Sequence, residues 1–340
     1  MGDKTRQDLR IAYVCDGGAK LGLGHISRGR ALLSRAGGRL IVGTGADVVA
    51  SVVPDIAIAP WLASDRPLEP EELPESVVVV DHYGLSEEWI EEVRAHRPVA
   101  VVDDWLRPHT AADLVINPNV GAEATFYEGA SAASCLCGAS FALLRPELAT
   151  TAPASGASDV SGRVLLTLGG GDNALALHVA IDLLLARTAA RVRRLDVVLG
   201  PASSSDQVIP KSEGPVPVVV HQAPDDFVAL CRSAAVVVCS ASTTSHEMAY
   251  LGVAFVPVVT VANQERIGRG WEEVGLAPYV SIDDPRFAER LGEQVDRLVA
   301  DADERRRRIS LGRSLVDGNG AERVLSALSR LVPGGPGRDV

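Results

Sequence analysis

The histidine at position 25 follows a glycine-rich turn in the stretch GLGHISRGR, residues 22–30. The pattern places it at the start of a helix, where a neutral imidazole can take a proton near pH 7 and act as a general base. We expect the free N–H groups and the positive dipole end of that helix to disfavour the imidazolium. Asp16 or Asp81 is available to orient the second ring nitrogen. The alternative is a histidine that caps the helix or positions a phosphate.

Two stretches in the second half of the chain have the composition of phosphate-binding loops. Residues 169–172 read GGGD and residues 240–245 read SASTTS, each before an expected helix. Glycine lets the backbone approach an anion, and a helix N-terminus offers free N–H groups. No Gly-Lys-Ser/Thr follows, so neither stretch is a P-loop. Packing turns and helix capping are the alternatives. Glu247 completes a capping box with Thr244 or accepts the hydroxyls of a ribose.

Short β-branched runs alternate with amphipathic stretches throughout, which predicts an α/β fold of two doubly wound, Rossmann-like parallel sheets. We expect an N-terminal domain over 1–150, a small-residue linker over 151–162, a C-terminal domain over 163–332 and a tail over 333–340. Ligands of such sheets bind beyond the carboxyl ends of the strands. We therefore expect the strand ends of the two domains to face each other across a cleft.

Composition excludes several classes of function. The formal net charge of −11 disfavours a nucleic-acid partner. No apolar run approaches a membrane span, and no signal core follows the polar N-terminus, so we expect a cytoplasmic protein. The five cysteines are expected to be free thiols in a reducing compartment. Gly22-Leu23-Gly24 lacks the third glycine of an NAD fingerprint, and Asp103-Asp104 alone is too small a ligand set for a metal. The run Arg305–Arg308 is interpreted as a solvated helix face.

Several motifs occur together and in order between Ile11 and Ile267. They are VDHYGLSEEW, VVDDWLRPHTAADLVINPN, YEG, CGASFALLRPEL, LTLGGGDN, SASTTSHEMAYLGV and VANQ. With these motifs the chain resembles the UDP-2,4-diacetamido-2,4,6-trideoxy-β-L-altropyranose hydrolase family, including its spore-coat-polysaccharide type. Members of that family make a pseudaminic acid precursor. The resemblance implies the GT-B fold, which is shared with glycosyltransferases that use UDP-sugars.

The resemblance also implies roles for individual residues. His25 is the base that activates water for attack on the anomeric carbon, and UDP leaves with inversion; with it we place Asp16 in the catalytic set. The residues expected to face the sugar or an acceptor are Gly24, Arg28, Asp81, His82, Tyr83, Asp104, Trp105, Asn119, Tyr127, Arg145, Asn263 and Gln264. Those expected to bind UDP are Gly22, Gly169, Gly170, Gly171, Asp172, Ser240, Ser242, Thr243, Thr244 and Glu247. No metal ion or cofactor is expected.

The chain departs from the family pattern at four positions. Val14 stands where an arginine is usual, Trp105 replaces a small aliphatic residue, and His246 replaces an aromatic or aliphatic one. Arg30 lies in the first helix, where many relatives are apolar. These differences fall near the sugar or acceptor side more than the UDP side, so they leave the identity of the sugar substrate open and do not disturb the prediction of a bound nucleotide.

Three functions are therefore compared. The first is a metal-independent UDP-sugar hydrolase with water as nucleophile. The second is a GT-B glycosyltransferase that moves a sugar such as glucuronic acid from UDP to a small acceptor, for example the nucleobase cytosine, with Trp105 stacked on a flat ring. The third is a non-catalytic nucleotide-sugar binding protein. The expected partners are a UDP-sugar and a small acceptor, with no nucleic acid and no membrane, for a monomer or a homodimer.

Overall fold

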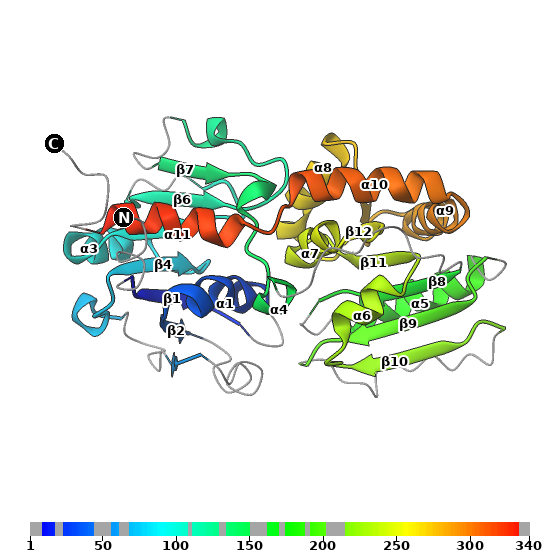
Figure 1. Ribbon diagram of the computed structural model, residues 1–340, viewed down its shortest axis with the longest axis horizontal. Helices are drawn as coiled ribbons and strands as arrows, with labels where there is room; N and C mark the ends of the chain where they lie inside the picture. Colours follow the sequence, from blue (N-terminus) through cyan, green and yellow to red (C-terminus); the bar gives the residue numbers. More distant parts are fainter. Residues whose placement is uncertain are drawn as a thin grey trace. The chain divides into compact units, whose positions relative to one another are not determined.

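A computed structural model describes residues 9–17, 23–43, 56–60, 68–107, 111–128, 134–149, 162–169, 174–187, 191–201 and 215–332 (Figure 1). The chain divides into two compact units. Unit 1 comprises Met1–Pro146 with Gly318–Val340, and unit 2 comprises Glu147–Asp317. Each unit is described by itself.

Unit 1 is built on a seven-stranded parallel sheet with the order β3-β2-β1-β4-β5-β6-β7. Its strands are β1 (Ile11–Cys15), β2 (Gly38–Val42), β3 (Ile58–Pro60), β4 (Val77–Asp81), β5 (Val99–Val102), β6 (Leu114–Asn117) and β7 (Ser134–Cys137). Its helices are α1 (Gly24–Ala36), α3 (Glu87–His96) and α11 (Gly320–Leu331), with short 3₁₀ turns η1 (Pro70–Glu72), η2 (Ala124–Tyr127) and η3 (Ala139–Phe141). The short helix α4 (Pro146–Ala149) begins at the residue where the first segment of unit 1 ends and continues into unit 2. The strands β1, β4, β5 and β6 are buried along their whole length, as their continuous apolar sequences predict.

Unit 2 repeats this arrangement with six strands in the order β10-β9-β8-β11-β12-β13. The strands are β8 (Arg163–Thr167), β9 (Arg194–Leu199), β10 (Val218–Gln222), β11 (Val236–Ser240), β12 (Phe255–Val259) and β13 (Val280–Ser281). The helices are α5 (Ala174–Arg187), α6 (Phe227–Arg232), α7 (Thr243–Leu251), α8 (Glu265–Glu273), α9 (Phe287–Ala300) and α10 (Ala302–Leu315), with η5 (Ala262–Gln264). All strand pairs in both sheets are parallel. The predicted pair of doubly wound domains is thus confirmed.

The strand order reverses direction once in each sheet. In unit 1 the chain moves outward from β1 through β2 to β3 and then returns to β4, on the other side of β1. In unit 2 the same reversal lies between β8 and β11. Loops leave in opposite directions at such a point and open a crevice at the carboxyl ends of the two strands, where ligands of open α/β sheets bind. The topology therefore singles out the ends of β1 and β4 and the ends of β8 and β11.

Helix α1 packs close against the strands that carry the first of these points. Gly29 faces the sheet, and a Cβ there would lie 2.8 Å from both Tyr13 Cδ1 and Leu40 Cδ1. The missing side chain lets the helix approach β1 and β2 closely. Ile26 and Leu32 on the same helix are buried in the core that these strands share. This close packing brings the first turn of α1, with His25, to the ends of β1 and β4.

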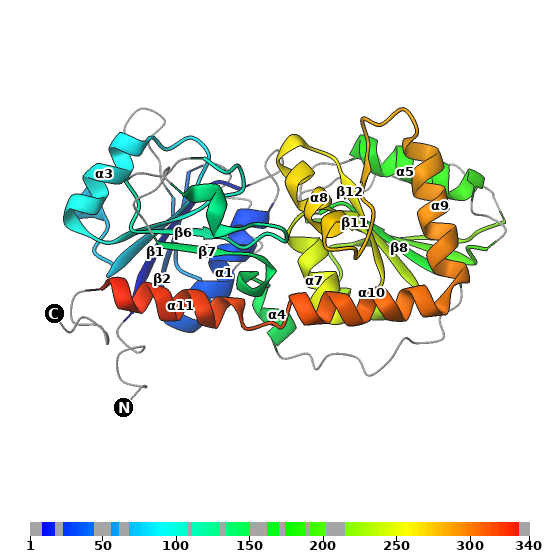
Figure 2. The ribbon, with the colours of Figure 1, turned by 90° about the horizontal axis from the view of Figure 1, so that it is seen from above.

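The last helix corrects the predicted domain boundary. The sequence assigned residues 163–332 to the second domain, but α11 belongs to unit 1. Its Ala321, Val324 and Leu328 are buried in the core cluster that includes β1 and α1, and Figure 2 shows α11 beside α1. An amphipathic pattern predicts that a helix covers a sheet, but not which sheet. The predicted linker lies outside the described residues except for Gly162, and the predicted tail lies wholly outside them.

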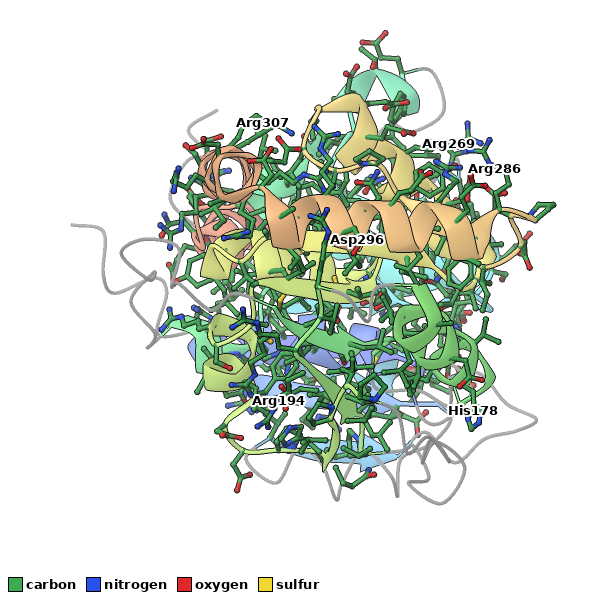
Figure 3. The ribbon with its side chains drawn as sticks, turned by 90° about the vertical axis from the view of Figure 1, so that its right-hand side faces the viewer. His178, Arg194, Arg269, Arg286, Asp296 and Arg307 are labelled. Carbon is green, nitrogen blue, oxygen red and sulfur yellow. The ribbon has the colours of Figure 1, made fainter. Side chains whose placement is uncertain are left out.

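The arginine run in α10 is only partly solvated, which corrects a second prediction. Arg306 and Arg307 are exposed, and Arg307 lies on the outer side of the unit (Figure 3). Arg305 and Arg308 are 8% and 2% exposed. The Arg305 guanidinium donates to the carbonyls of Leu298 and Val299 at 2.6 and 3.0 Å, at the end of α9. Residues three apart share one helix face, so a run of four arginines places two of them inward.

The structure also bears on the expected strands, the cysteines and membrane spans. The short edge strands β3, β7 and β13 were not predicted, because they are brief and only half-buried or carry a proline. All five cysteines are free thiols. Among the helices that the structure describes, none is long and apolar enough to cross a bilayer.

Candidate active site

The candidate base lies at the reversal point of the first sheet. Asp81 is the last residue of β4, and its Cα partner on β1 is Cys15. His25 is the second residue of α1, which follows the loop from β1. Because β1 and β4 pair in parallel, they end at the same edge of the sheet. The first turn of α1, with His25, lies at this edge. Gly24 opens α1 and is half-buried, whereas Gly22 lies outside the described residues.

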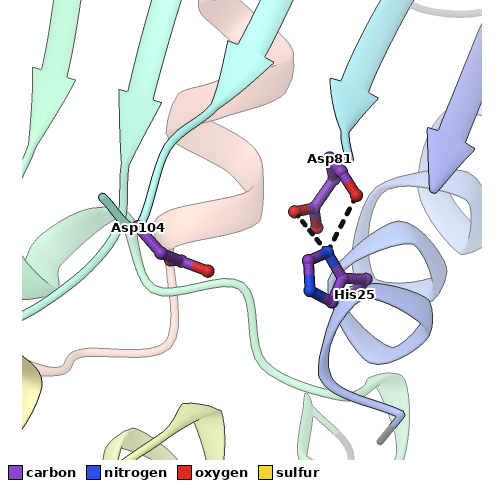
Figure 4. A group of neighbouring side chains, drawn as sticks. All are labelled: His25, Asp81 and Asp104. Carbon is purple, nitrogen blue, oxygen red and sulfur yellow. Dashed lines mark hydrogen bonds and ion pairs between the residues drawn. The ribbon is translucent and has the colours of Figure 1, made fainter. Parts of the chain in front are cut away.

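His25 is oriented by Asp81. Its Nδ1 lies 2.8 Å from the backbone oxygen of Asp81 and 2.8 Å from Oδ1 of the same residue (Figure 4). Both atoms are acceptors, so Nδ1 carries the hydrogen and donates it. In the neutral ring Nε2 then holds the lone pair, and it can accept a proton. Of the two aspartates predicted to orient His25, Asp81 is the one in contact.

The Asp81 carboxylate is fully buried, and every one of its lone pairs is used. Tyr13 donates its hydroxyl hydrogen to Oδ2 at 2.6 Å. Arg28 donates through Nε to Oδ2 at 2.8 Å and through Nη2 to Oδ1 at 2.7 Å. Burial alone would raise the pKa of Asp81, but the charges of Arg28 and His25 and their hydrogen bonds hold it well below its usual range. Asp81 is therefore a permanent anion beside the imidazole.

This anion changes the expected protonation of His25. Burial lowers the pKa of His25, while the charge of Asp81 and its hydrogen bond raise it, and the net pKa lies above the ordinary value of 6.5. From the sequence, the helix N-terminus was expected to disfavour the imidazolium. That expectation was wrong in sign, because a full charge at hydrogen-bond distance outweighs the partial charges of a helix terminus.

A second carboxylate completes the cluster. Asp104 follows β5 and is 6% exposed. It accepts bonds from Arg28 Nη2 at 3.0 Å, from the Tyr83 hydroxyl at 2.9 Å and from Asn119 Nδ2 at 2.9 Å. The Tyr83 ring in turn meets the His25 ring edge-on, with the centroids 4.8 Å apart. The structure therefore brings together six of the predicted residues: His25, Arg28, Asp81, Tyr83, Asp104 and Asn119.

An exposed aromatic residue adjoins this cluster. Trp105 is 36% exposed, and its ring centroid lies 5.9 Å from that of Tyr83. The Arg107 guanidinium lies 5.9 Å from the indole centroid, within the range of a cation–π contact. The Tyr83 ring thus connects the buried His25 to the exposed Trp105.

Other predicted residues have different partners. Asp16 accepts from His82 Nε2 at 2.7 Å, and His82 Nδ1 accepts from the Gly84 amide at 2.9 Å. Tyr127 is 2% exposed, and its hydroxyl donates to Asp103 Oδ2 at 2.7 Å. This buried bond holds the loop after β5, so Tyr127 does not present its hydroxyl to a ligand. Arg145 is half-buried after η3.

Tyr13 was not among the residues predicted from the sequence, although its hydroxyl donates to Asp81. Tyr13 lies inside a continuous buried strand and looks like an ordinary core aromatic residue. The available signal was chemical, since a fully buried tyrosine hydroxyl needs a hydrogen-bond partner. Burial and the neighbouring Asp81 charge raise the pKa of Tyr13 well above its usual value, so it remains a donor.

The cluster has the residue types of a metal site, but the carboxylate oxygens of Asp81 and Asp104 already accept hydrogen bonds from Arg28. In the part of the chain that the structure describes, one ligand atom each from His25, Asp81 and Asp104 lies within 4.8 Å of the others. The Arg28 guanidinium donates to both carboxylates, and it supplies the positive charge that a cation would bring. We therefore assign no metal ligand in this cluster.

The second reversal point carries hydroxyl groups. Gly169 follows β8 with φ of +97°, and a Cβ there would lie 3.5 Å from Ser240 Oγ at the end of β11. Ser240 Oγ and Ser242 Oγ are 2.8 Å apart. Ser242 is the N-cap of α7 and accepts from the Thr244 amide at 3.4 Å. Thr243 opens the helix. Gly170, Gly171 and Asp172 lie outside the described residues.

The cap at Ser242 corrects the predicted capping box. A box with Glu247 required Thr244 at the cap, but α7 begins at Thr243. Glu247 instead lies inside the helix and is fully buried. His246 is also buried, with its ring centroid 5.1 Å from that of Trp271. Its Nδ1 lies 3.2 Å from the Ser242 carbonyl oxygen.

The remaining predicted residues follow β12. Gln264 Oε1 accepts from the Thr260 amide at 2.9 Å and from the Thr260 hydroxyl at 3.2 Å. These bonds stabilise the turn η5. Asn263 lies in the same turn and is half-buried.

No protein-family model matches the chain, and no curated protein matches it. Among solved structures, MurG of Acinetobacter baumannii superposes with a TM-score of 0.66 and 14% identity, covering 94% of this chain and 99% of that one. The spinosyn rhamnosyltransferase SpnG complexed with thymidine diphosphate gives 0.59 and 12%, covering 94% and 100%. The UDP-GlcNAc 2-epimerase of Neisseria meningitidis bound to UDP-GlcNAc gives 0.59 and 11%, covering 95% and 100%. At these identities the likeness establishes the fold, which is the predicted GT-B type.

Proposed function

We propose that this protein is an enzyme that cleaves the anomeric C–O bond of a UDP-sugar and releases UDP with inversion, with His25 as general base and water as nucleophile. The observation that carries the proposal is the bond from His25 Nδ1 to the buried Asp81, which leaves Nε2 as the accepting nitrogen. The fold adds support, because structures of the same fold include proteins crystallised with UDP-GlcNAc and with thymidine diphosphate.

The proposed chemistry is one displacement. Nε2 takes a proton from water while the water oxygen bonds to the anomeric carbon on the face opposite the leaving group. The bond between that carbon and the diphosphate oxygen breaks, and its electron pair leaves with UDP. A single displacement inverts the configuration. The imidazolium formed on His25 is stabilised by the ionised Asp81, as in other histidine–aspartate pairs.

For the UDP part we propose the second reversal point. Ser240, Ser242, Thr243 and Thr244 surround the start of α7, a nine-residue helix whose first N–H groups suit a diphosphate. Gly169 lets the backbone after β8 lie close to Ser240. Glu247, which was predicted to bind the ribose, is fully buried, so the proposal does not assign it to a ligand. Hydroxyls and amides placed before the reaction stabilise developing negative charge on the leaving group, so the proposal assigns no metal ion or cofactor.

A glycosyltransferase on the same scaffold is the second candidate, and Trp105 favours it. Its indole is 36% exposed and lies next to Tyr83, which contacts the base. An exposed aromatic ring offers a stacking surface for a flat acceptor, for example a nucleobase. His25 would then remove a proton from the acceptor instead of from water. A non-catalytic nucleotide-sugar binding protein is the third candidate, and it predicts UDP binding without UDP release.

One experiment separates the three candidates. The purified chain is incubated with a panel of UDP-sugars, each with and without small hydroxylated or heteroaromatic acceptors, and free UDP is measured. Release without an acceptor supports the hydrolase, and release that needs an acceptor supports the transferase. UDP binding with no release under any condition would leave the binding protein. His96→Ala is the matched control for His25→Ala, because His96 lies exposed at the end of α3.

A further inference from the structure

The charges around His25 do not cancel while its ring is neutral. Asp81 and Asp104 are two buried carboxylates, and Arg28 is the cation that bonds to both. One negative charge is therefore left over in this cluster. When His25 takes a proton, that excess disappears. The cluster is thus arranged to favour a proton on His25, and the balance between Arg28 and Asp104 decides by how much.

Arg28 and His25 share the Asp81 carboxylate as a partner. Its side chain is 7% exposed, and its Nη2 lies 2.7 Å from Asp81 Oδ1 and 3.0 Å from Asp104 Oδ2. Its Nε is 2.8 Å from Asp81 Oδ2, and its Nη1 is 3.4 Å from Asp104 Oδ1. Every donor group of this guanidinium therefore lies against a carboxylate of the cluster. Arg28 was predicted to face a sugar, but its donor groups are instead bonded to Asp81 and Asp104.

We propose that Arg28 and Asp104 are positioning residues that set, with opposite signs, how readily His25 takes and gives up its proton. Neither needs to touch the substrate. Arg28 fixes the Asp81 carboxylate against the imidazole and offsets its charge. Asp104 fixes Arg28 from the far side and restores negative charge. The consequence for turnover rests on the proposed function, whereas the consequence for the titration of His25 does not.

The physical directions follow from the charges. The guanidinium of Arg28 lowers the pKa of His25, and the carboxylate of Asp104 raises it. Without Arg28, His25 would hold its proton to higher pH and would be a poor base near neutrality. Without Asp104, His25 would be neutral over a wider range but would accept a proton less strongly. The other titratable groups near this cluster are Tyr13 and Cys15 on β1, Asp16 with His82, and Tyr83.

The test is the titration of His25 in the full chain without any ligand, followed by NMR of the imidazole resonances. The His25 signal is assigned by its loss in His25→Gln. We expect Arg28→Gln to raise the titration midpoint by about 1 pH unit and Asp104→Asn to lower it by about 1 pH unit. Arg28→Lys retains the charge and should keep the midpoint near that of the wild type.

Midpoints that stay unmoved, or that move in the same direction in Arg28→Gln and Asp104→Asn, would overturn the inference. Thermal unfolding shows whether Arg28→Gln folds. If it does not, Asp104→Asn decides alone, and an unmoved or raised midpoint there contradicts the inference. The acid limb of the pH profile for UDP release should shift with the midpoint. A chain that releases no UDP at all would refute the proposed function and leave the titration result valid.

Discussion

Two buried aspartates, one in each sheet, each bind a histidine and at least one arginine, but they differ in their position in the sheet. Asp81 on β4 binds His25, Arg28 and Tyr13. Asp196 on β9 binds His221 at 2.8 Å, Arg163 at 2.7 Å and Arg194 at 2.8 Å. Both aspartates are fully buried, and in both the partners hold the pKa below its usual value, for Asp196 at about 2. Residue types alone therefore do not distinguish the two clusters.

Position in the sheet and exposure of the partners do distinguish them. Asp81 ends its strand at the reversal point of the sheet, and its partners His25 and Arg28 are 6% and 7% exposed. Asp196 lies inside β9, and Arg163 and Arg194 open their strands at the opposite edge. Arg194 is 42% exposed, so water screens much of its charge. A similar ionic arrangement thus lies in one sheet at the ligand edge, where we propose proton transfer, and in the other sheet away from that edge.

Replacement of His25 and of His221 should show the largest difference between the two clusters in the rate of UDP release. We expect His25→Ala to lower the rate of UDP release by about 10²–10⁴-fold, because the proton acceptor is lost. His221→Ala should leave the rate nearly unchanged. UDP binding, measured by calorimetry, should persist in both variants. A His25→Ala protein with undiminished turnover would remove His25 from its proposed role.

Replacement of the two aspartates should affect both activity and stability. Asp81→Asn should lower turnover by up to about 10⁴-fold, because the imidazolium of His25 loses its anionic partner, and should destabilise the fold by about 3–5 kcal/mol, because Arg28 loses a buried charged partner. Asp196→Asn should cost about 1–2 kcal/mol with no loss of turnover, since its arginines reach water. Urea unfolding and UDP release measure the two effects. Equal losses of turnover in both variants would contradict the proposal that only the Asp81 cluster takes part in the reaction.

The pH dependence of stability should reflect the lowered carboxylate pKa values. A carboxylate with a depressed folded-state pKa stabilises the protein above its unfolded pKa near 4, and this contribution is lost as pH falls toward the folded value. For Asp196 the loss should fall between about pH 4 and about pH 2. Urea unfolding at several pH values should show a shallower decline in Asp196→Asn than in the wild type. An unchanged decline would mean that Asp196 is not preferentially ionised in the folded state.

The contribution of His25 to the free energy of unfolding has the opposite pH dependence to that of Asp196. Its pKa is raised on folding, so its contribution is fully present below about pH 6.5, the unfolded value, and is lost as pH rises through the folded pKa. The decline on the alkaline side should therefore be weaker in His25→Gln. A variant that declines as steeply as the wild type over this range would contradict the raised pKa.

The smallest effect is expected at the exposed aromatic residues. For a hydrolase, Trp105→Ala should change UDP release little. For a transferase, the same change should raise the KM for a flat acceptor by about 10-fold, from the loss of about 1 kcal/mol or more of stacking. Phe126→Ala is the control, because Phe126 is 46% exposed and has no contact with Tyr83 or Arg107 among the ring contacts described. Equal effects of the two substitutions would argue against a specific stacking role for Trp105.

Much of the fold was predictable because its pattern is local. Buried parallel strands read as continuous β-branched runs, and the polar residues that follow them mark the ligand edge. The polar residues at strand ends therefore included His25, Asp81 and Asp104 as candidate site residues. The pattern did not show which aspartate meets His25, since Asp16 and Asp81 both follow neighbouring strands. Their partners, His82 and His25, depend on side-chain directions that strand order does not specify.

By itself the sequence determined the two parallel sheets, their order along the chain and the chemical types gathered at their carboxyl ends. These follow from periodicity and from residue types within a few positions of each other. Only the tertiary structure decided that α11 covers the first sheet, that Arg305 and Arg308 point inward, and that Arg28 bridges two carboxylates. Each depends on contacts between segments far apart in the chain, and a buried charge acquires its partner and its pKa only when those segments pack.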